Sequence, residues 1–274
     1  MIQVTLLSMH DDPIRALYMA YRVCYSKLTP QSILARIEKD RITHEQMLEF
    51  VKEKLETGHV SPLEQVWFEF GISGVSRAFS HQFVRTRVGF SPEQQSQRYV
   101  VYDDGKFEYS TPATIDARPR LHERYRWLMR EIASFYDDAV KEGVPGEDAR
   151  FVLPNATNTN LKVTLNFAAL LHMADLRLCT RAQWEYRKTV ALMRSEIKKK
   201  WPVLAEQMQP KCGDKRLGYC DESMEAYLAC PLGKVRPHKK TLQEAFLDAR
   251  KPTRVIVPLD EELVSWATEY EEPR

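Results

Sequence analysis

The sequence predicts a globular protein in which helices and strands pack around a substantial hydrophobic core. Hydrophobic residues make up 43% of the chain and charged residues 28%, close to the averages of globular proteins. Residues 158–166 alternate Leu161, Val163 and Leu165 with polar side chains, which is typical of a half-buried strand. Residues 118–142 instead place apolar side chains at helical spacing. A chain of 274 residues can form one large domain or two small ones.

The other elements are predicted from the same periodicities, taken in chain order. The expected strands are residues 2–8, 66–72, 158–166 and 254–257. The expected helices are residues 13–25, 43–56, 75–84 and 118–142, one that begins at Phe167, residues 180–201 and 241–250, and a final acidic helix. Thr43 and Gln46 form a capping box at the start of the second helix, which Gly58 ends, and Thr180 and Gln183 repeat the capping pattern.

Three of these helices carry apolar stripes that we expect to be buried in the core. In the helix at 13–25 the stripe is Ile14, Leu17, Tyr18 and Tyr21. In the helix at 118–142 it is Leu121, Tyr125, Leu128, Ile132 and Phe135. In the helix at 180–201 it is Trp184, Val190, Met193, Ile197 and Trp201.

The charge balance and the lack of long apolar stretches limit the classes of partner. Forty basic and thirty-eight acidic residues give a net charge of +2, too small to drive non-specific binding to nucleic acid. The first residues lack a basic region followed by an apolar one, and the longest apolar stretches, such as 167–171, are too short to span a bilayer. We therefore expect a cytoplasmic protein that binds neither a membrane nor nucleic acid.

The cysteines are five in number, which favours free thiols or a metal over a disulfide framework. Three of them fall within residues 210–240, a segment rich in Gly, Pro and Lys, and a histidine lies close by. These residues are Cys212, Cys220, Cys230 and His238. A zinc site is one interpretation, but the spacings match no compact zinc knuckle. We favour free thiols in a long loop and assign no metal ligand.

A polar segment at residues 82–99 is the main candidate for a binding site. Gly89 and Pro92 interrupt it, so no single helix or strand is expected to hold it. Guanidinium groups match phosphate oxygens in a fixed plane, and hydroxyl and backbone NH groups complete an anion cradle. The alternative is a solvated loop whose arginines pair with nearby carboxylates. The polar residues are Gln82, Arg85, Arg87, Ser91, Gln94, Gln95, Ser96, Gln97 and Arg98.

The order of these residues resembles the Arg-His-Arg…Ser signature of the flavin-dependent thymidylate synthases. The matching residues are Gln82, Arg85, Arg87, Ser96 and Arg98. Thr86 stands where the family has His, Glu93 stands where Asn is usual, and the gap between the second Arg and the Ser is one residue longer than in the signature.

Three further segments resemble the same family, in the same order along the chain. Residues 59–64 are similar to its His-x-Thr/Ser-Pro-x-Glu turn, although the residues alone would be interpreted as turn caps. Residues 149–154 are similar to its Ala-Arg-x-x-Leu-Pro segment, and residues 166–185 to its Asn-x-Arg…Leu-Arg…Ala-Gln-Trp-Glu stretch. Ala168 replaces an arginine that usually touches the flavin. The resemblance covers roughly residues 15–205.

The resemblance implies an α+β fold with a mixed sheet flanked by long helices, working as a homotetramer whose active sites assemble at subunit interfaces. We expect a catalytic domain at residues 1–209 and a loop-rich C-terminal extension at residues 210–274 that packs on it. The implied reaction methylates C5 of dUMP, with methylenetetrahydrofolate as the carbon donor and NADPH-reduced FAD as the hydride donor.

The resemblance also implies roles for individual residues. Arg177 is the implied catalytic residue, which polarises the uracil with a permanent charge. The implied dUMP-binding residues are Gln82, Arg85, Gln94, Gln95, Ser96, Gln97, Arg98, Arg150 and Arg177. The implied FAD-binding residues are His59, Ser61, Glu64, Arg85, Thr86, Arg87, Asn166 and His172. Arg150 is implied to reach a neighbouring subunit.

The sequence favours a reaction without a cysteine nucleophile. C5 of uracil is a poor nucleophile, so the ring must be activated by covalent attack at C6 or by stabilising negative charge on its N3, C2 and C4 atoms. Cys230 lies outside every matched segment, and Cys179 is the better-placed thiol. We expect neither to attack the substrate.

Two other functions remain open from the sequence. The departures at Thr86, Glu93 and Ala168 allow a flavin- or nucleotide-binding homologue that transfers another one-carbon unit to a pyrimidine nucleotide. A nucleic-acid-binding module would use the arginine segment and the basic residues between 211 and 240. The near-neutral net charge and the few aromatic residues near the arginines argue against it.

Overall fold

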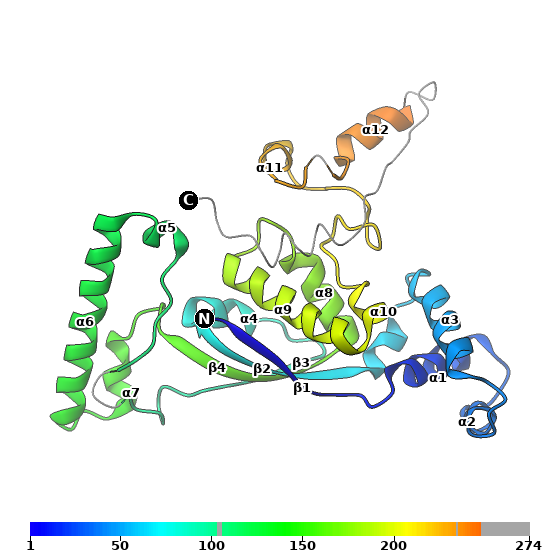
Figure 1. Ribbon diagram of the computed structural model, residues 1–274, viewed down its shortest axis with the longest axis horizontal. Coiled ribbons are helices and arrows are strands. Elements are labelled where there is room, and N and C mark those ends of the chain that lie inside the picture. The colour runs from blue at the N-terminus through cyan, green and yellow to red at the C-terminus, as the bar shows by residue number, and fades with distance from the viewer. Residues whose placement is uncertain (103–105, 234, 248–274) are drawn as a thin grey trace.

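The computed structural model describes residues 1–102, 106–233 and 235–247. Its centre is a four-stranded sheet in the order β1-β2-β4-β3, with helices stacked on one face (Figure 1). The strands are β1 (Gln3–Met9), β2 (Trp67–Ser76), β3 (Phe90–Gln94) and β4 (Asn158–Asn166). Helices and strands therefore combine as expected for the α+β class.

The predicted mixed sheet is wrong for the described residues, because all three ladders are antiparallel. An antiparallel sheet can keep one face in water, whereas parallel strands are usually covered on both faces. The alternation of apolar and polar residues along β4 already indicates a sheet with one face in water. Val163 and Leu165 are buried, while Lys162 points to the other face and its Nζ lies 2.9 Å from Glu69 Oε1. The sheet is thus apolar on one side and polar on the other.

Two helices cover the apolar face of the sheet, α8 (Phe167–Arg177) and α9 (Trp184–Lys200). They pack over fully buried aromatic residues of β2, including Phe68 and Phe70. Of the predicted stripe, Val190, Met193 and Ile197 are buried in α9, whereas Trp184 and Trp201 are only partly buried. The short helix α10 (Pro202–Ala205) follows α9 directly.

The remaining helices lie at the ends of the sheet or beyond its helical layer (Figure 1). At one end are α1 (Pro13–Tyr25), α2 (Pro30–Glu38) and α3 (His44–Leu55). At the other end are α5 (Ala113–Asp116), α6 (Pro119–Lys141) and α7 (Gly146–Ala149). Beyond α8 and α9 are α11 (Met224–Leu228) and α12 (Lys239–Leu247). Three short elements complete the described chain: η1 (Ser61–Gln65), α4 (Arg77–Phe83) and η3 (Arg150–Val152).

Several predicted boundaries and caps are confirmed. Helix α1 and strand β4 have the predicted bounds. The capping box is present, since Gln46 N donates to Thr43 Oγ1 at 3.2 Å and Thr43 N donates to Gln46 Oε1 at 2.9 Å. The stripe of α1 is buried.

Other predicted boundaries are wrong. Strand β2 runs on to Ser76, so α4 begins at Arg77 and not at residue 75. The second capping box does not form: Gln183 caps α9 by accepting a hydrogen bond from Tyr186 N at 2.9 Å, and the helix begins at Trp184. Strand β3 lies where no strand was expected. The predicted strand at 254–257 and the final acidic helix lie outside the described residues.

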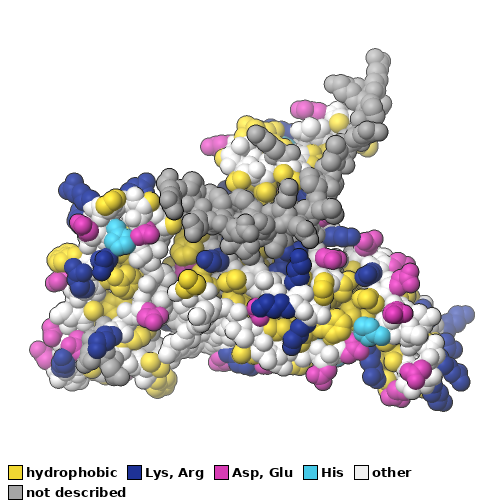
Figure 2. Space-filling view, viewed as in Figure 1, with side chains coloured by type: hydrophobic (Ala, Val, Ile, Leu, Met, Phe, Trp, Pro, Cys, Tyr) yellow, Lys and Arg dark blue, Asp and Glu magenta, His cyan; other side chains and the backbone are white. Residues whose placement is uncertain are grey.

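The apolar stripe of α6 is the main error in the predicted core. Leu121, Leu128 and Phe135 are 46%, 46% and 61% exposed, while Met129 and Tyr136 are buried. Figure 2 shows hydrophobic side chains on the surface at the α6 end of the molecule. Helical spacing predicts that a stripe will be covered, but it does not tell whether the cover comes from the same chain.

Membrane insertion through a helix finds no support in the described residues, since none of their helices is both long and apolar enough to cross a bilayer.

Candidate active site

A cavity of about 410 Å³ opens between the end of α4, the face of α8 and the start of α9. It gathers residues that lie far apart in the sequence, from Glu64 in η1 to Tyr186 in the first turn of α9. The predicted site residues that line it are Glu64, Gln82, Arg85, Thr86, Arg87, Asn166, His172 and Arg177. Ala168 lines it too. The arginine segment and the stretch from residue 166 therefore build one site.

Helix α4 delivers Gln82 and the arginines to the cavity. Ser76 caps this helix by accepting a hydrogen bond from Phe79 N at 3.1 Å. Phe79 and Phe83 are fully buried, with their ring centroids 4.9 Å apart. Because these residues fix the helix, the chain leaves it at a defined place and presents residues 85–87 at the cavity.

The guanidinium groups of Arg85, Arg87 and Arg177 form no ion pair with a carboxylate in the part of the chain that the structure describes. Unlike most surface arginines, they lie along a cavity together with apolar side chains. The charge gathered there is available to an anionic ligand, which guanidinium groups bind through paired donors.

Asn166 joins the sheet to the wall of the cavity. Its Oδ1 accepts a hydrogen bond from Ala169 N at 2.8 Å and so caps α8, and its N donates to Gly89 O at 2.9 Å. Gly89 has a φ of 65°, and a Cβ there would lie 2.5 Å from Asn166 Nδ2. Only glycine allows this close approach. The contact holds the arginine segment against the start of α8.

Arg177 lies at the far end of α8, where its position depends on an aromatic ring. Its guanidinium carbon is 4.5 Å from the ring centroid of Tyr186, a fully buried residue of α9. The Tyr186 hydroxyl is 3.4 Å from Thr86 Oγ1. Burial raises the pKa of Tyr186, so the ring stays neutral and forms a cation–π contact with Arg177.

A buried carboxylate fixes the start of α9 against α4. Glu185 is 2% exposed, and its Oε1 accepts a hydrogen bond from Ser76 N at 2.9 Å. Its Oε2 accepts from the Ser76 hydroxyl and from Gln183 Nε2. This network explains two residues of the Ala-Gln-Trp-Glu stretch, Gln183 and Glu185, as supports for the neighbouring Tyr186.

Sequence reasoning missed Tyr186 as a cavity residue. It directly follows the matched stretch, and this adjacency was an available signal. An aromatic residue at helical spacing is, however, interpreted as core, and Tyr186 does pack edge-on against Phe79 and Phe83, with 5.3 Å between ring centroids in each case. It is both a core residue and part of the cavity lining.

The predicted phosphate ligands Arg98 and Arg150 do not line the cavity; they lie near α7. Arg98 Nε is 2.6 Å from Glu147 Oε2, and Arg150 Nε donates to Glu147 O at 3.1 Å. Arg77 lies nearby: burial lowers its pKa, and the charge of Arg150 lowers it further. We call Arg77, Arg98 and Arg150 the α7 arginine cluster. Arg77, at the first position of α4, was also missed by sequence reasoning.

The predicted residues between 94 and 97 also lie outside the cavity. Gln94 Nε2 donates to Ser80 Oγ at 2.9 Å, and Gln95 Oε1 accepts from Asn160 Nδ2 at 2.9 Å. Ser96 Oγ accepts from Arg98 N at 3.1 Å. The Gln97 side-chain nitrogen is buried and has no hydrogen-bond partner among the described residues. Residues 94–97 are thus held by hydrogen bonds away from the cavity. The Gln97 side-chain amide is the one donor named here that lacks a partner among the described residues.

The turn at residues 59–64 contributes only Glu64 to the cavity. His59 Nδ1 lies 2.9 Å from the Tyr25 hydroxyl and its Nε2 lies 3.0 Å from Ser61 Oγ. The His59 ring thus contacts other side chains and does not cap the turn, so the turn-capping interpretation is wrong for this residue. His59 lines a different cavity, beside Tyr21.

Glu93 does not pair with an arginine among the described residues. It lies on β3 opposite Lys162 of β4, and its side chain is exposed. From the sequence, a glutamate next to a phosphate site is expected either to pair with an arginine or to weaken the site. Pairing with an arginine is wrong for the described residues, and a weakened phosphate site stays a prediction.

The lining of the cavity suits a flavin. Its apolar surface comes from Val88, Ala168, Ala169, Met173 and Leu176. A planar apolar ring system with a phosphate-bearing chain needs such a surface next to cations, and Arg85 and Arg87 supply the cations. At Ala168 a methyl group lines the cavity where an arginine is usual in the family.

Comparisons with known proteins show which family the sequence matches. Residues 5–203 match the family described as "Thymidylate synthase complementing protein". The flavin-dependent thymidylate synthase of Nitratidesulfovibrio vulgaris is 39% identical over 228 residues, which cover 80% of this chain and 91% of the relative. That of Geobacter sulfurreducens is 37% identical over 211 residues, 77% of this chain and 88% of the relative. That of Pyrococcus furiosus is 35% identical over 229 residues, 81% and 90%.

Proposed function

The chain belongs to the thymidylate synthase complementing protein family, whose relatives described above are flavin-dependent thymidylate synthases, and we propose that it performs their reaction with FAD as the flavin. In this proposal dUMP is methylated at C5, methylenetetrahydrofolate gives the carbon and NADPH reduces the flavin. The observation that supports it most directly is the cavity in which Arg85, Arg87 and Arg177 meet an apolar surface.

Arg177 activates the uracil in this proposal. A fixed positive charge next to the ring stabilises negative charge on its N3, C2 and C4 atoms, which makes C5 more nucleophilic. A guanidinium carries a permanent positive charge and needs no proton transfer to act, and Tyr186 keeps it in place. The bound flavin supplies the hydride that completes the methyl group.

The other cavity residues bind and orient the two ligands. Arg85 and Gln82 hold the nucleotide, and Arg87, Asn166 and His172 hold the flavin. Glu64 and Thr86, which also line the cavity, contact the flavin in this proposal. Cys179 and Cys230 do not line the cavity, which supports activation of the uracil by charge and not by a thiolate.

We further propose that the active site is completed by other copies of the chain in a homotetramer. Arg98 and Arg150 lie outside the cavity, so a neighbouring subunit must bring the α7 arginine cluster to the nucleotide phosphate. His59 and Ser61 would reach a neighbour's flavin in the same way. The exposed apolar side chains of α6, among them Trp127 at 54% and Phe135 at 61%, offer a surface for such contacts.

The test is an anaerobic visible spectrum of the purified protein, followed by addition of NADPH with and without dUMP. A flavin spectrum that bleaches faster with dUMP supports both the cofactor and the nucleotide site. Product analysis after addition of methylenetetrahydrofolate then identifies dTMP. Bleaching without dTMP would favour the homologue that transfers another one-carbon unit, and a protein that binds no flavin but retains single-stranded DNA would favour the nucleic-acid-binding module.

A further inference from the structure

Four of the five cysteines lie in one region near the end of α8, apart from the residues that line the cavity. Cys179 follows α8, and Cys212, Cys220 and Cys230 come from the segment after α10. All are free and partly buried. Cys24 is exposed on α1 and stands apart from them. The contacts of the neighbouring residues show how the three segments meet.

The first contact brings Cys212 to the end of α8. Lys211 N donates to Asp175 O at 3.0 Å, one turn before Cys179. The Asp175 carboxylate also forms an ion pair with Arg216. Both contacts flank Cys212 in the sequence, so its backbone is held against the same turn of helix that leads to Cys179.

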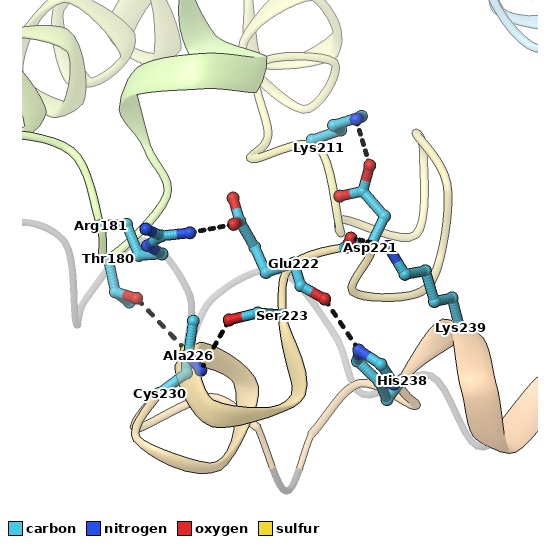
Figure 3. A network of polar contacts seen from close by, with 10 residues as sticks. All are labelled: Thr180, Arg181, Lys211, Asp221, Glu222, Ser223, Ala226, Cys230, His238 and Lys239. Carbon is cyan, nitrogen blue, oxygen red and sulfur yellow. Dashed lines mark hydrogen bonds and ion pairs between the residues drawn. The ribbon is translucent and has the colours of Figure 1, made fainter.

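The second and third contacts bring Cys220 and Cys230 to the residues after Cys179 (Figure 3). The Thr180 hydroxyl lies 3.3 Å from the sulfur of Cys230. Arg181 forms an ion pair with Glu222, two residues after Cys220. Residues 175–181 thus contact the chain beside every one of the three later cysteines.

The thiols also affect one another electrostatically. Burial and the nearby Cys179, Cys220 and Cys230 together raise the pKa of Cys212 to about 12. Burial likewise raises the pKa of Cys179, and Cys230 and Cys220 contribute. The four thiols therefore lie close enough to one another for their charges to interact.

His238 does not complete this group, although the sequence suggested it as a fourth ligand. Its ring is fully buried, and Nε2 donates to Glu222 O at 2.9 Å. Its Nδ1 accepts a hydrogen bond from Lys240 N at 3.2 Å. Both nitrogens are therefore occupied by the backbone, and the histidine instead holds the segment in shape. Cys179, far away in the sequence, takes the fourth place.

We propose that Cys179, Cys212, Cys220 and Cys230 bind one zinc ion as four thiolates. Sulfur ligands in a tetrahedral set select zinc, and a closed set of four protein ligands is typical of a structural site. Each thiol loses its proton to solvent as the metal binds. The site goes beyond the proposed reaction and does not depend on it.

Zinc binding is coupled to a local rearrangement. Among residues 1–102, 106–233 and 235–247, no three His, Cys, Asp or Glu side chains are already arranged to hold an ion. The metal must therefore draw the thiols together, as happens in small domains that order on binding zinc. The zinc site would connect the chain from residue 210 onward to the loop that holds Cys179. Arg177 lies only two residues before this cysteine.

The first experiment uses the full-length wild-type protein. We expect elemental analysis after purification without chelators to find about one zinc per chain. A thiol reagent should label Cys24 at once, and the other four thiols should react only as a chromogenic chelator records zinc release. Absence of zinc together with no binding of added Zn²⁺, rapid labelling of all five thiols, disulfides among the four, or iron with labile sulfide would each overturn the proposal.

Variants locate the metal on these residues. C212S and C220S should lose the zinc, while C24S, the matched control, should retain it. H238Q separates the two ligand sets, because it should retain zinc if Cys179 is the fourth ligand and lose it if His238 is. Since a variant can also lose zinc by unfolding, Co²⁺ substitution of the wild type gives an independent readout: thiolate-to-cobalt charge-transfer bands are expected, and a spectrum of oxygen- or nitrogen-bound cobalt would contradict the assignment.

Discussion

The cavity and the α7 arginine cluster hold arginines in different ways. In the cavity, Arg177 lies against the fully buried ring of Tyr186, and the helices beside it are fixed by buried aromatic residues. In the α7 arginine cluster, Arg98 is held by an ion pair with Glu147 in which both side chains are about half exposed. An exposed ion pair contributes only about 0 to 1 kcal/mol.

The difference suggests that the cavity acts in the reaction and the α7 arginine cluster in substrate binding. A charge that must act on a ring during the reaction is best held by neighbours that do not move, because its stabilising effect depends on prior orientation. An arginine that binds a phosphate can form a weak ion pair in the free protein and replace its carboxylate partner with the ligand. We therefore expect substitutions in the cavity to affect turnover or folding, and substitutions in the cluster to affect substrate binding alone.

Arg177→Ala is expected to have the largest effect. Loss of one fixed charge that stabilises a developing anion lowers kcat by about 10²–10³-fold. Turnover of dUMP in single-turnover mixing measures this effect, with circular dichroism to show that the fold is retained. Arg36→Ala, on the exposed surface of α2, is the matched control and should leave kcat unchanged. A fall in kcat of less than tenfold would mean that another group activates the uracil.

Gly89→Ala is expected to disturb the cavity through the backbone. The new Cβ would lie 2.5 Å from Asn166 Nδ2, at a positive φ of 65°. Strain of this kind costs about 1–3 kcal/mol, and we expect denaturant unfolding to show it together with weaker flavin retention. Gly58→Ala is the matched control, since Gly58 has a φ of 73° but nothing within 4 Å of the added atom. Equal losses in the two variants would show that the contact with Asn166 contributes nothing.

Arg98→Gln tests the cluster. We expect KM for dUMP to rise about tenfold, a loss of about 1.4 kcal/mol in binding, with the free energy of unfolding unchanged within about 0.5 kcal/mol. Glu147→Gln removes the same ion pair but leaves the arginine, so its KM should stay the same or fall. A rise in KM in both variants would show that Glu147 positions Arg98 for the nucleotide.

The same comparison shows what the sequence could predict about the fold. Alternation predicted β4, helical spacing predicted α1 and a capping box predicted α3. These elements depend on local spacing and local hydrogen bonds. Strand β3 escaped prediction because Pro92 argues against a strand. Its place at the edge of the sheet, opposite Val163, lets it contain a residue that cannot donate to the ladder. The stripe of α6 was assigned to the core because periodicity does not identify what covers it.

The candidate site was predicted best where motif residues lie on neighbouring turns of one element. Asn166, His172 and Arg177 share α8 and line the cavity together. Tyr186 was missed because a buried aromatic residue has the same signature whether it packs a core or also supports a guanidinium. Cys179 was missed as a partner of the later cysteines because its approach to Cys230 depends on tertiary contacts that no spacing along the chain records.

Thr86→His tests the smallest effect, the contact that this chain has lost relative to its family signature. The Thr86 hydroxyl lies 3.4 Å from the Tyr186 hydroxyl, whereas an imidazole can stack on a flavin ring. Aromatic stacking contributes about 0.5–1.5 kcal/mol, so we expect the Kd for FAD to fall by roughly two- to tenfold in a fluorescence titration. Thr86→Ser keeps the hydroxyl and should leave the Kd unchanged. Weaker FAD binding by the histidine variant would mean that the cavity is already shaped around Thr86 and that the larger side chain displaces Tyr186, which would in turn lower kcat through Arg177.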